Sequence, residues 1–495
     1  MSRLRSNPVR TATGAALAAL VLVCLAAWPA LAQEVGTDWS QFQGGPGHPG
    51  TIAEAPIPPY RELWRFSPPE GALSGAVISG DLTIAVGESA VYALELGTGE
   101  IAWELPRDGG RLSVPALGVT GERRVLVYLD GPREDEEGTG SSSPSPSTSP
   151  SSSVSPSGQP ADQNAVKVSE LVAVDLGDRS ELWRTPLEDA SRSGVALEGD
   201  RAYAADDEGR VYAVELATGA VAWSGKAIGR VESPPAVADG NVYVVARSAD
   251  ERTAQVLALD PETGERRWTF SPQAGAVAVS AVSAQDGVVV FGSADRLVRG
   301  SAAEDGKVRW EALTLTLFSP VSAPAFRPGG VWVADASGGL YRIDPADGGR
   351  DWEHQTNELV VRSSPVVAGA YVLLGLNDGR LVAFDDRNGD LVYESRASQG
   401  LIGQIALSRE VVVAVKGGKQ PGLIAFEHDP EGTLVRIVSP TVPDPARLFG
   451  AFAVAFAIAG VVILVPFRLL RSRFAPAFTR DDGLDDGEGA EEETS

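Results

Sequence analysis

The sequence predicts an all-β protein: an eight-bladed β-propeller of four-stranded blades, with one transmembrane helix near the C-terminus. Three observations carry this prediction. A unit of about 42 residues recurs eight times, each unit reads as four short apolar strands, and residues 448–467 form a run without charge. Asx-Gly and Thr-Gly turns separate the strands, because glycine supplies the positive φ that tight hairpins need. Four strands repeated at this period are typical of a propeller.

The repeat is clearest in residues 91–103, 211–223 and 256–268, which share the pattern Ala-x-Asp/Glu-x-x-Thr-Gly-x-x-x-Trp. Looser copies begin at Leu171, Val298, Leu340, Leu381 and Leu423. From Leu171 onward the copies start 40–45 residues apart, and the one larger gap contains an insertion. Helical repeats are excluded because no unit shows an apolar period of 3.6 residues.

Seven tryptophans occupy one slot in the fourth strand, as a packing contact between blades would require: Trp64, Trp103, Trp183, Trp223, Trp268, Trp310 and Trp352. A carboxylate recurs just before the following turn: Glu95, Asp175, Glu215, Asp260, Asp344, Asp385 and Glu427. The turn residues of the complete copies are Thr98, Gly99, Thr218, Gly219, Thr263 and Gly264. Because general acid–base pairs need two different environments, we interpret the repeated carboxylates as acceptors for turn N–H groups.

The sequence offers no catalytic, cofactor-binding or metal-binding residue that we would name. Three histidines are scattered, and the single cysteine is Cys24. Asp206, Asp207 and Glu208 stand where other units have a hairpin turn; we favour the turn, with a cation site as the alternative. The formal net charge of −24 argues against nucleic acid as a partner, since an acidic surface repels phosphate.

Residues 1–32 are predicted to be a secretory signal peptide. Arg3, Arg5 and Arg10 precede an apolar run at residues 15–27, and Ala30-Leu31-Ala32 is typical of a cleavage site. The apolar run, about 20 Å long as a helix, is too short for a ~30 Å bilayer. An uncleaved anchor is the alternative, and Cys24 is read as apolar filler rather than a lipidation site because Val23 is not small.

The propeller is predicted over residues 61–440, after an N-terminal entry segment at residues 33–60. Residues 61–66 resemble a fourth strand without a third strand before them, so they could complete the last blade and remove its open edge. The eighth unit, which runs to about Val435, is the poorest copy and is expected to need that strand. Seven blades remain the alternative if this unit is only a strap.

An insertion at residues 133–165 interrupts the second unit. It leads from a run of carboxylates into nearly pure Ser, Pro, Thr and Gly. Such a composition cannot bury enough apolar surface to fold, so we expect a disordered loop between the second and third strands of that blade. It is interpreted as a spacer, with glycosylation as the alternative.

The C-terminal part is predicted as a linker (441–447), a transmembrane helix (448–470) and an acidic, disordered cytoplasmic tail (471–495). Arg468, Arg471 and Arg473 follow the apolar run, whereas only Arg447 precedes it. Because positive charge stays inside, the tail is expected in the cytoplasm and the propeller outside it. The predicted location is therefore the bacterial cell membrane, with a single pass.

The complete copies of the repeat resemble those of the pyrroloquinoline-quinone-like (PQQ-like) propeller family, as does the entry segment with Trp39, Gln41, Phe42, His48 and Gly50. The resemblance covers residues 39–440 and implies eight blades. The family contains both quinoprotein dehydrogenases and non-enzymatic envelope scaffolds related to outer-membrane assembly. The chain is more similar to the scaffold branch, because its exported part has no cysteine and no acidic cluster for calcium. Known scaffold members are lipid-anchored through a cysteine, which this chain replaces with a predicted helix.

The expected function is that of a membrane-anchored, extracytoplasmic platform for protein interaction in the cell envelope. It would be no enzyme and need no cofactor. Its partner would be another envelope or membrane protein, with residues 448–470 in the membrane, and the chain would be a monomer or part of a hetero-complex. The alternatives are a ligand-sensing ectodomain and, less favoured, a PQQ-dependent dehydrogenase.

Overall fold

A computed structural model describes residues 39–131 and 168–437, apart from short stretches at 227–228, 232, 248–252, 273–278, 315–321, 361 and 397–399. The chain divides into two units, Met1–Ser439 and Pro440–Ser495, and every described residue belongs to the first. The predicted signal peptide (1–32), insertion (133–165), linker (441–447), membrane span (448–470) and tail (471–495) all lie outside the described residues. Within the described ranges, no helix combines the length and the apolar character that crossing a bilayer requires.

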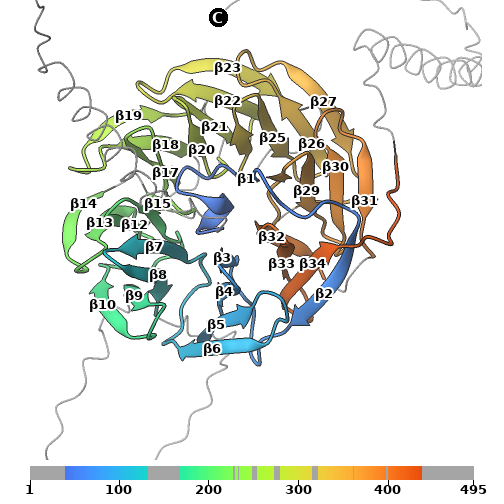
Figure 1. Ribbon diagram of the computed structural model, residues 1–495. Coiled ribbons are helices and arrows are strands. Elements are labelled where there is room, and N and C mark those ends of the chain that lie inside the picture. The colour runs from blue at the N-terminus through green and yellow to red at the C-terminus, as the bar shows by residue number, and fades with distance from the viewer. Residues whose placement is uncertain are drawn as a thin grey trace, which may run out of the picture. The chain divides into compact units, whose positions relative to one another are not determined.

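Eight sheets of at least four strands stand around a common axis, which confirms the predicted eight-bladed propeller (Figure 1). In blades 1 to 7 the strands run in chain order from the inside of the ring to its outer rim. Blade 1 holds β3 (Val77–Ser79), β4 (Leu82–Val86), β5 (Ala90–Glu95) and β6 (Ile101–Pro106). Blade 2 holds β7 (Ala116–Thr120), β8 (Arg123–Asp130), β9 (Glu170–Asp175) and β10 (Glu181–Pro186). Blade 3 holds β11 (Ala196–Glu198), β12 (Arg201–Ala205), β13 (Arg210–Glu215) and β14 (Val221–Lys226).

The remaining blades follow the same order. Blade 4 holds β16 (Ala236–Ala238), β17 (Asn241–Arg247), β18 (Ala254–Leu259) and β19 (Arg266–Phe270), with β15 (Arg230–Val231) also paired to β17. Blade 5 holds β20 (Ser283–Gln285), β21 (Val288–Gly292), β22 (Leu297–Ala302) and β23 (Val308–Leu313). Blade 6 holds β24 (Ala325–Arg327), β25 (Gly330–Ala334), β26 (Gly339–Ile343) and β27 (Arg350–Gln355). Blade 7 holds β28 (Val366–Ala368), β29 (Tyr371–Gly375), β30 (Leu381–Asp385) and β31 (Leu391–Glu394).

The last blade is closed by a strand from the start of the propeller. Blade 8 consists of β32 (Ile402–Leu407), β33 (Val411–Lys416), β34 (Gly422–His428) and β2 (Tyr60–Phe66), and β2 pairs antiparallel with β34. The ring therefore has no open seam between its first and last blades. The expectation that the eighth unit continues to Val435 is wrong. Val435 and Ile437 instead hydrogen-bond with Val392 and Leu391 on the outer strand of blade 7.

A one-residue register shift occurs between the third and fourth strands of every blade, just before the aromatic slot. In blade 3, for example, Trp223 lies opposite Ala213, and the next pair is Val221 with Val214. Such a bulge bends the strand and re-aims its side chains. The aromatic side chain is thereby directed toward the neighbouring blade.

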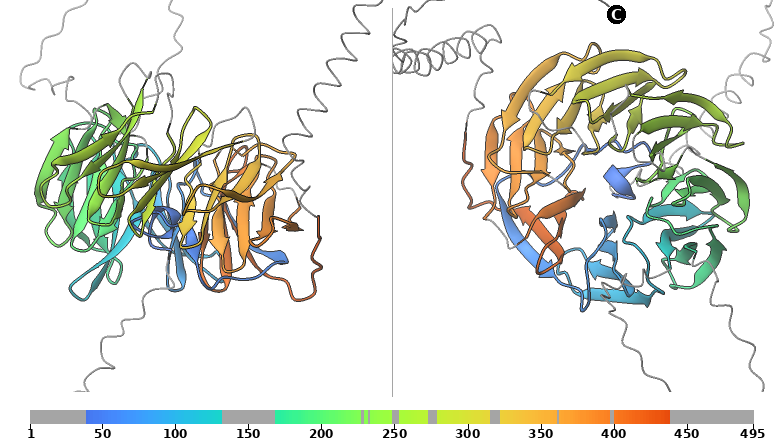
Figure 2. Two further views of the ribbon diagram at one scale, coloured as in Figure 1. Left: turned by 90° about the horizontal axis from the view of Figure 1, so that it is seen from above. Right: turned by 180° about the vertical axis from the view of Figure 1, so that it is seen from behind.

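The entry segment runs around the inside of the ring, with the short 3-10 helix η1 (Phe42–Gly44) within it (Figures 1 and 2). Its polar atoms accept a hydrogen bond from one inner-strand amide in each of blades 1 to 7; the donors are Ile78, Leu117, Leu197, Val237, Ala284, Phe326 and Val367. β1 (Thr51–Ile52) then lies parallel to β28. Because inner strands are sheet edges with unpaired backbone groups, this segment satisfies one donor on each of seven edges.

Candidate functional site

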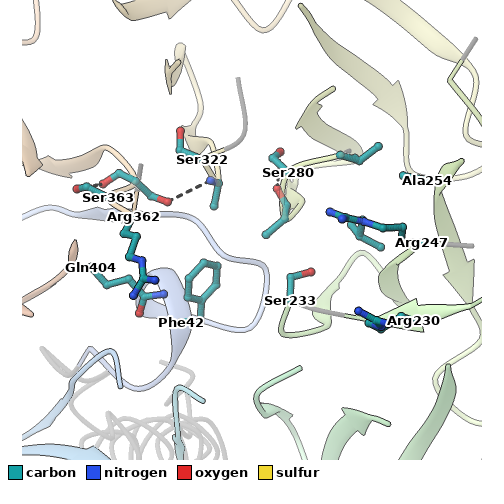
Figure 3. A pocket seen from close by; sticks show the side chains of 15 residues that line it. Phe42, Arg230, Ser233, Arg247, Ala254, Ser280, Ser322, Arg362, Ser363 and Gln404 are labelled. Atoms are coloured by element: carbon teal, nitrogen blue, oxygen red, sulfur yellow. Dashed lines mark hydrogen bonds between the residues drawn. The ribbon is translucent and has the colours of Figure 1, made fainter. Parts of the chain in front are cut away.

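The candidate site lies on the axis of the ring, where the inner ends of several blades meet. A cavity of about 330 Å³ opens there, and residues from the entry segment and blades 4 to 8 line it. Figure 3 shows Arg362 beside Gln404 and Phe42 on one side of the cavity, and Arg230 and Arg247 on the opposite side. Its volume lies in the range of small-ligand pockets.

A second cavity of about 370 Å³ adjoins the first and shares Arg362 and Gln404 with it. Leu73, Val114 and Lys416 are among the residues that line this second cavity. The two cavities form one polar and apolar surface from blade 4 across the axis to blade 1. We call the two together the axial cavities.

Four serines that recur just before the first strand of a blade are structural, and Ser74, Ser280 and Ser363 among them line the axial cavities. Ser74, Ser193, Ser280 and Ser363 each donate the hydroxyl to the next residue's carbonyl, at 2.9–3.5 Å. Each also accepts the amide twelve residues later, at 2.9–3.0 Å. These hydroxyls join the first strand of a blade to its second, so they are not spare ligand donors.

Among the described residues that line the axial cavities, the charged groups are all cations. Arg230, Arg247, Arg362 and Lys416 line them, and no aspartate or glutamate occurs among the described lining residues. This is unexpected in a chain whose net charge is −24. A cleft lined by one sign of charge concentrates the field and attracts groups of the opposite sign.

Lys416 and Arg362 differ in exposure. Lys416 is 4% exposed, and burial, with a smaller contribution from nearby Arg65, lowers the pKa of its ammonium group, which Glu62 partly offsets. Arg362 is exposed. Neither side chain forms an ion pair or hydrogen bond within the described ranges. Lys416 therefore presents its ammonium group to the second cavity without a protein partner among the described residues.

The entry segment forms the wall of the axial cavities through Phe42, and its fold depends on a buried histidine. His48 is fully buried, its Nδ1–H donates to the Val282 carbonyl at 2.9 Å, and its ring packs edge-on against Phe42. Burial lowers the pKa of His48 to about 4. The imidazole is therefore neutral at physiological pH and acts as a packing group.

Six of the seven repeated tryptophans make the same contact with the next blade. Their indole N–H groups donate at 2.7–2.9 Å to a turn carbonyl there; the pairs are Trp64–Leu96, Trp183–Leu216, Trp223–Pro261, Trp268–Ala303, Trp310–Pro345 and Trp352–Asp386. Trp103 is partly buried, and its N–H has no partner in the described part of the chain. These residues lie between blades and away from the axial cavities.

The repeated carboxylates divide by side-chain length. Asp175, Asp260, Asp344 and Asp385 each accept a backbone N–H two residues on, at 2.7–3.0 Å. The longer Glu215 instead accepts the Thr218 hydroxyl. The turn threonines Thr98, Thr218 and Thr263 each accept the amide two residues later, at 3.2–3.3 Å.

The acidic run at Asp206, Asp207 and Glu208 lies in a hairpin turn. Asp206 accepts the Arg210 amide and the Tyr212 hydroxyl, both at 2.8 Å, and Asp207 forms an ion pair with Arg192. Across the described ranges, no group of three or more His, Cys, Asp or Glu side chains is placed to hold a metal ion.

The cations of the axial cavities are functional candidates that the sequence pattern does not reveal. Arg230 and Arg247 come from blade 4, Arg362 precedes blade 7 and Lys416 belongs to blade 8, and all four stand outside the repeated slots. Arg247 ends β17 and Lys416 ends β33, so each follows an apolar strand that should otherwise end in a turn residue. A basic residue at that place is a signal that could have found these two, whereas Arg230 and Arg362 have no such signal.

Curated relatives of the chain have several functions. It is 25% identical over 294 residues to the outer membrane protein assembly factor BamB of Moranella endobia, covering 52% of this chain and 73% of that protein. It is 32% identical over 135 residues to the serine/threonine-protein kinase AfsK of Streptomyces griseus, covering 25% of this chain but only 16% of the kinase. It is 31% identical over 119 residues to a quinohemoprotein alcohol dehydrogenase of Pseudomonas putida, covering 21% of this chain and 17% of the enzyme.

Solved structures show the same fold at low identity. BamB from Moraxella catarrhalis matches with a TM-score of 0.52 at 16% identity, over 74% of this chain and 100% of that one. A europium-containing methanol dehydrogenase matches with a TM-score of 0.58 at 14% identity, over 79% of this chain and 91% of that one. A family model described as outer membrane protein assembly factor BamB matches residues 167–316 and 283–418. Because these matches together span just over half of the chain, the protein belongs to this PQQ-like propeller family.

Proposed function

We propose that the protein is a single-pass membrane protein of the bacterial envelope whose extracytoplasmic propeller is a docking platform for another envelope or membrane protein. The observation that carries this proposal is the match of residues 167–418 to a family described as an assembly factor, since an assembly factor acts by contacting other proteins. Residues 448–470 would be the anchor, on the strength of their apolar sequence and the arginines that follow.

The geometry supports a binding role rather than a catalytic one. The repeated tryptophans and carboxylates are engaged in contacts that hold the ring together. What differs from blade to blade is the inner surface, where cations and apolar groups gather around the axial cavities. Loops and inner ends on a rigid scaffold are where propeller-like folds carry their binding residues.

The test is proximity labelling in intact cells of the source organism. An engineered peroxidase is inserted at residues 141–160, within the predicted spacer, and biotinylated proteins are identified by mass spectrometry. The control carries the same enzyme on the signal peptide and residues 441–495 without the propeller. We expect reproducible enrichment of a small set of envelope proteins over that control. Equal labelling by both chains would contradict the proposal.

A further inference from the structure

Blade 8 differs from the other blades in how its inner strand meets the entry segment. The segment accepts one inner-strand amide from each of blades 1 to 7, for example that of Val367 in blade 7. Strand pairing makes Leu407 the corresponding residue of blade 8. Within the described ranges, no hydrogen bond joins the entry segment to β32, although η1 lies against this strand.

The sequence of blade 8 changes at the same place. By the same pairing, Gly403 and Gln404 stand where blade 7 has Ser363 and Ser364. Gly403 therefore lacks the hydroxyl that joins the first two strands of other blades. Gln404 carries a long amide side chain, which lies beside Phe42 of η1 (Figure 3). This side chain has no hydrogen-bond partner among the described residues.

Gln43 of η1 carries a second amide without a partner. The residue is 5% exposed, and its Nε2 atom is buried without a hydrogen-bond acceptor in the described part of the chain. Its φ of +53° lies in the left-handed region, which residues other than glycine adopt only where the surrounding structure holds them there. Because a buried donor without an acceptor destabilises the fold, the site calls for an acceptor beside Gln43.

A small cavity between Gln43 and Gln404 has the size of one water molecule. Its volume is about 10 Å³, and a cavity needs roughly 10–15 Å³ to hold a water. Ser364 also lines it, and the hydroxyl oxygen of this residue accepts the Ala323 amide at 3.1 Å. Two amide side chains and one hydroxyl provide the two to four polar partners that a buried water requires. The cavity is too small for an organic ligand.

We infer that one ordered water molecule binds in this small cavity and links the entry segment to blade 8. The water accepts the Gln43 Nε2–H group and donates to the side-chain oxygen atoms of Gln404 and Ser364. It makes about three hydrogen bonds, as buried waters typically do. Blade 8 is thereby joined to the entry segment through a water, where blades 1 to 7 are joined directly. This site belongs to the ring itself and does not depend on the docking function.

A crystal structure of the full-length protein in detergent, at a resolution that shows ordered water, tests the site directly. We expect a water about 3 Å from side-chain atoms of both Gln43 and Gln404. Gln43→Met keeps the length of the side chain but removes the donor, so the water should be lost. The control Gln285→Met, on the inner strand of blade 5, should retain it. A wild-type cavity without water, or a direct hydrogen bond between the two amides, would overturn the inference.

Urea denaturation provides an independent test in solution. Gln43→Met and Gln404→Met should each lower the free energy of unfolding, and the double variant should lose only about as much as the more damaging single variant. The reason is that either change removes the water for both residues. Gln43→Met combined with Gln285→Met should instead give additive losses, because Gln285 bonds to Asp286 in blade 5.

Additive losses for Gln43→Met and Gln404→Met would contradict a shared water. If Gln43→Met does not fold, the crystal structure of Gln404→Met replaces it, since that variant removes the other amide. The water should then be absent or displaced. A water that keeps its place in Gln404→Met would show that Gln404 does not hold it, and the link to blade 8 would be wrong.

Discussion

At the scale of single residues, the propeller is held together by one contact repeated between blades. A tryptophan on the outer strand donates its indole N–H to a turn carbonyl of the next blade, and its ring lies against the glycine of that turn. The space is full: a Cβ on Gly219 would lie 2.7 Å from the Trp183 ring. Positive φ at this turn position, +75° in Gly219, is a second reason for glycine there.

The contribution of the indole hydrogen bond to the free energy of unfolding can be measured by comparing two tryptophans. Trp183 donates to Leu216 at 2.8 Å, whereas Trp103 has no such bond within the described chain. Trp183→Phe should lower the free energy of unfolding by about 1–2 kcal/mol more than Trp103→Phe, because it leaves a carbonyl without its donor. Urea denaturation of both variants gives the difference. Equal losses would show that ring packing alone stabilises the contact.

The weak contact of Trp103 has a visible cause in the next turn. Where the other turns have glycine, blade 2 has Arg179, which is exposed and has a φ of +66°. A side chain is disfavoured in that conformation. Arg179→Gly should therefore raise the free energy of unfolding by about 1 kcal/mol. Arg179→Ala is the matched control, since it also removes the charge but keeps the Cβ. If alanine stabilises as much as glycine, the backbone explanation is wrong.

His48 should make stability depend on pH. Its pKa falls from 6.5 in the unfolded chain to about 4 in the folded one, because burial disfavours the charged ring. The unfolded state therefore binds more protons between these values, and stability falls as the pH drops from 6.5 to 4, by about 3 kcal/mol for this group. Below pH 4 the contribution is constant.

The variant His48→Asn tests this dependence, because asparagine tolerates the positive φ of +55° at this position and does not titrate. Chemical denaturation at several pH values should show a smaller loss of stability on acidification than in the wild type. His428→Asn, on the last strand of the ring, serves as the control. A slope unchanged by His48→Asn would assign the acid sensitivity to other groups, among them His354, whose pKa burial also lowers.

At the scale of elements, the entry segment fastens the inner edges of seven blades. Gln41 does this for blade 3 with its side chain, which accepts the Leu197 amide and donates to the Leu197 carbonyl, at 2.9 and 3.0 Å. Each of the other six blades is fastened by a backbone carbonyl of the segment. We call this hydrogen-bonded entry segment the belt. Removing one of its hydrogen bonds should destabilise the inner strand of one blade only.

Hydrogen exchange can test whether each hydrogen bond of the entry segment protects only its own blade. Gln41→Ala should speed exchange of the Leu197 amide by removing its acceptor, and should leave the amides of Leu117 and Val237 in the neighbouring blades as protected as before. Mass spectrometry of peptides covering β7, β11 and β16 measures the three sites. Faster exchange in all three blades would mean that the segment acts as one cooperative unit and not through separate links.

The strands could be predicted closely from the sequence, and the belt could not. In blade 7, alternating apolar residues between Gly369, Gly379 and Gly389 mark β29, β30 and β31, because glycine turns and strand periodicity are local signals. Most of the belt's hydrogen bonds use backbone carbonyl groups. Because every residue has one, no residue type in the sequence marks these contacts. For the same reason the pairing of Val435 and Ile437 with blade 7 has no signature in the sequence, and the repeat pattern alone extends the eighth unit too far.

At the scale of the whole molecule, closure of the ring creates the candidate site. Arg230 and Arg247 of blade 4 stand far apart in the chain from Arg362 and from Lys416 of blade 8, and only the ring brings these three places around one axis. The sequence repeat predicts the ring, but it contains only the positions that the blades have in common. Residues that differ between blades are invisible to it, and these are the ones that line the axial cavities.

The proposed membrane topology can be tested by labelling cysteines introduced at chosen positions. Cys24 is the single cysteine and lies in the predicted signal peptide, so Cys24→Ser gives a background without thiols. In this background Lys307→Cys adds a thiol on an exposed outer turn of blade 5, and Ser495→Cys adds one at the C-terminus. Positive charge after residues 448–467 should keep the tail inside. A membrane-impermeant maleimide should therefore label Lys307→Cys in intact spheroplasts, and Ser495→Cys only after the membrane is permeabilised. Labelling of Ser495→Cys in intact spheroplasts would contradict a cytoplasmic C-terminus and, with it, the anchoring on which the docking proposal depends.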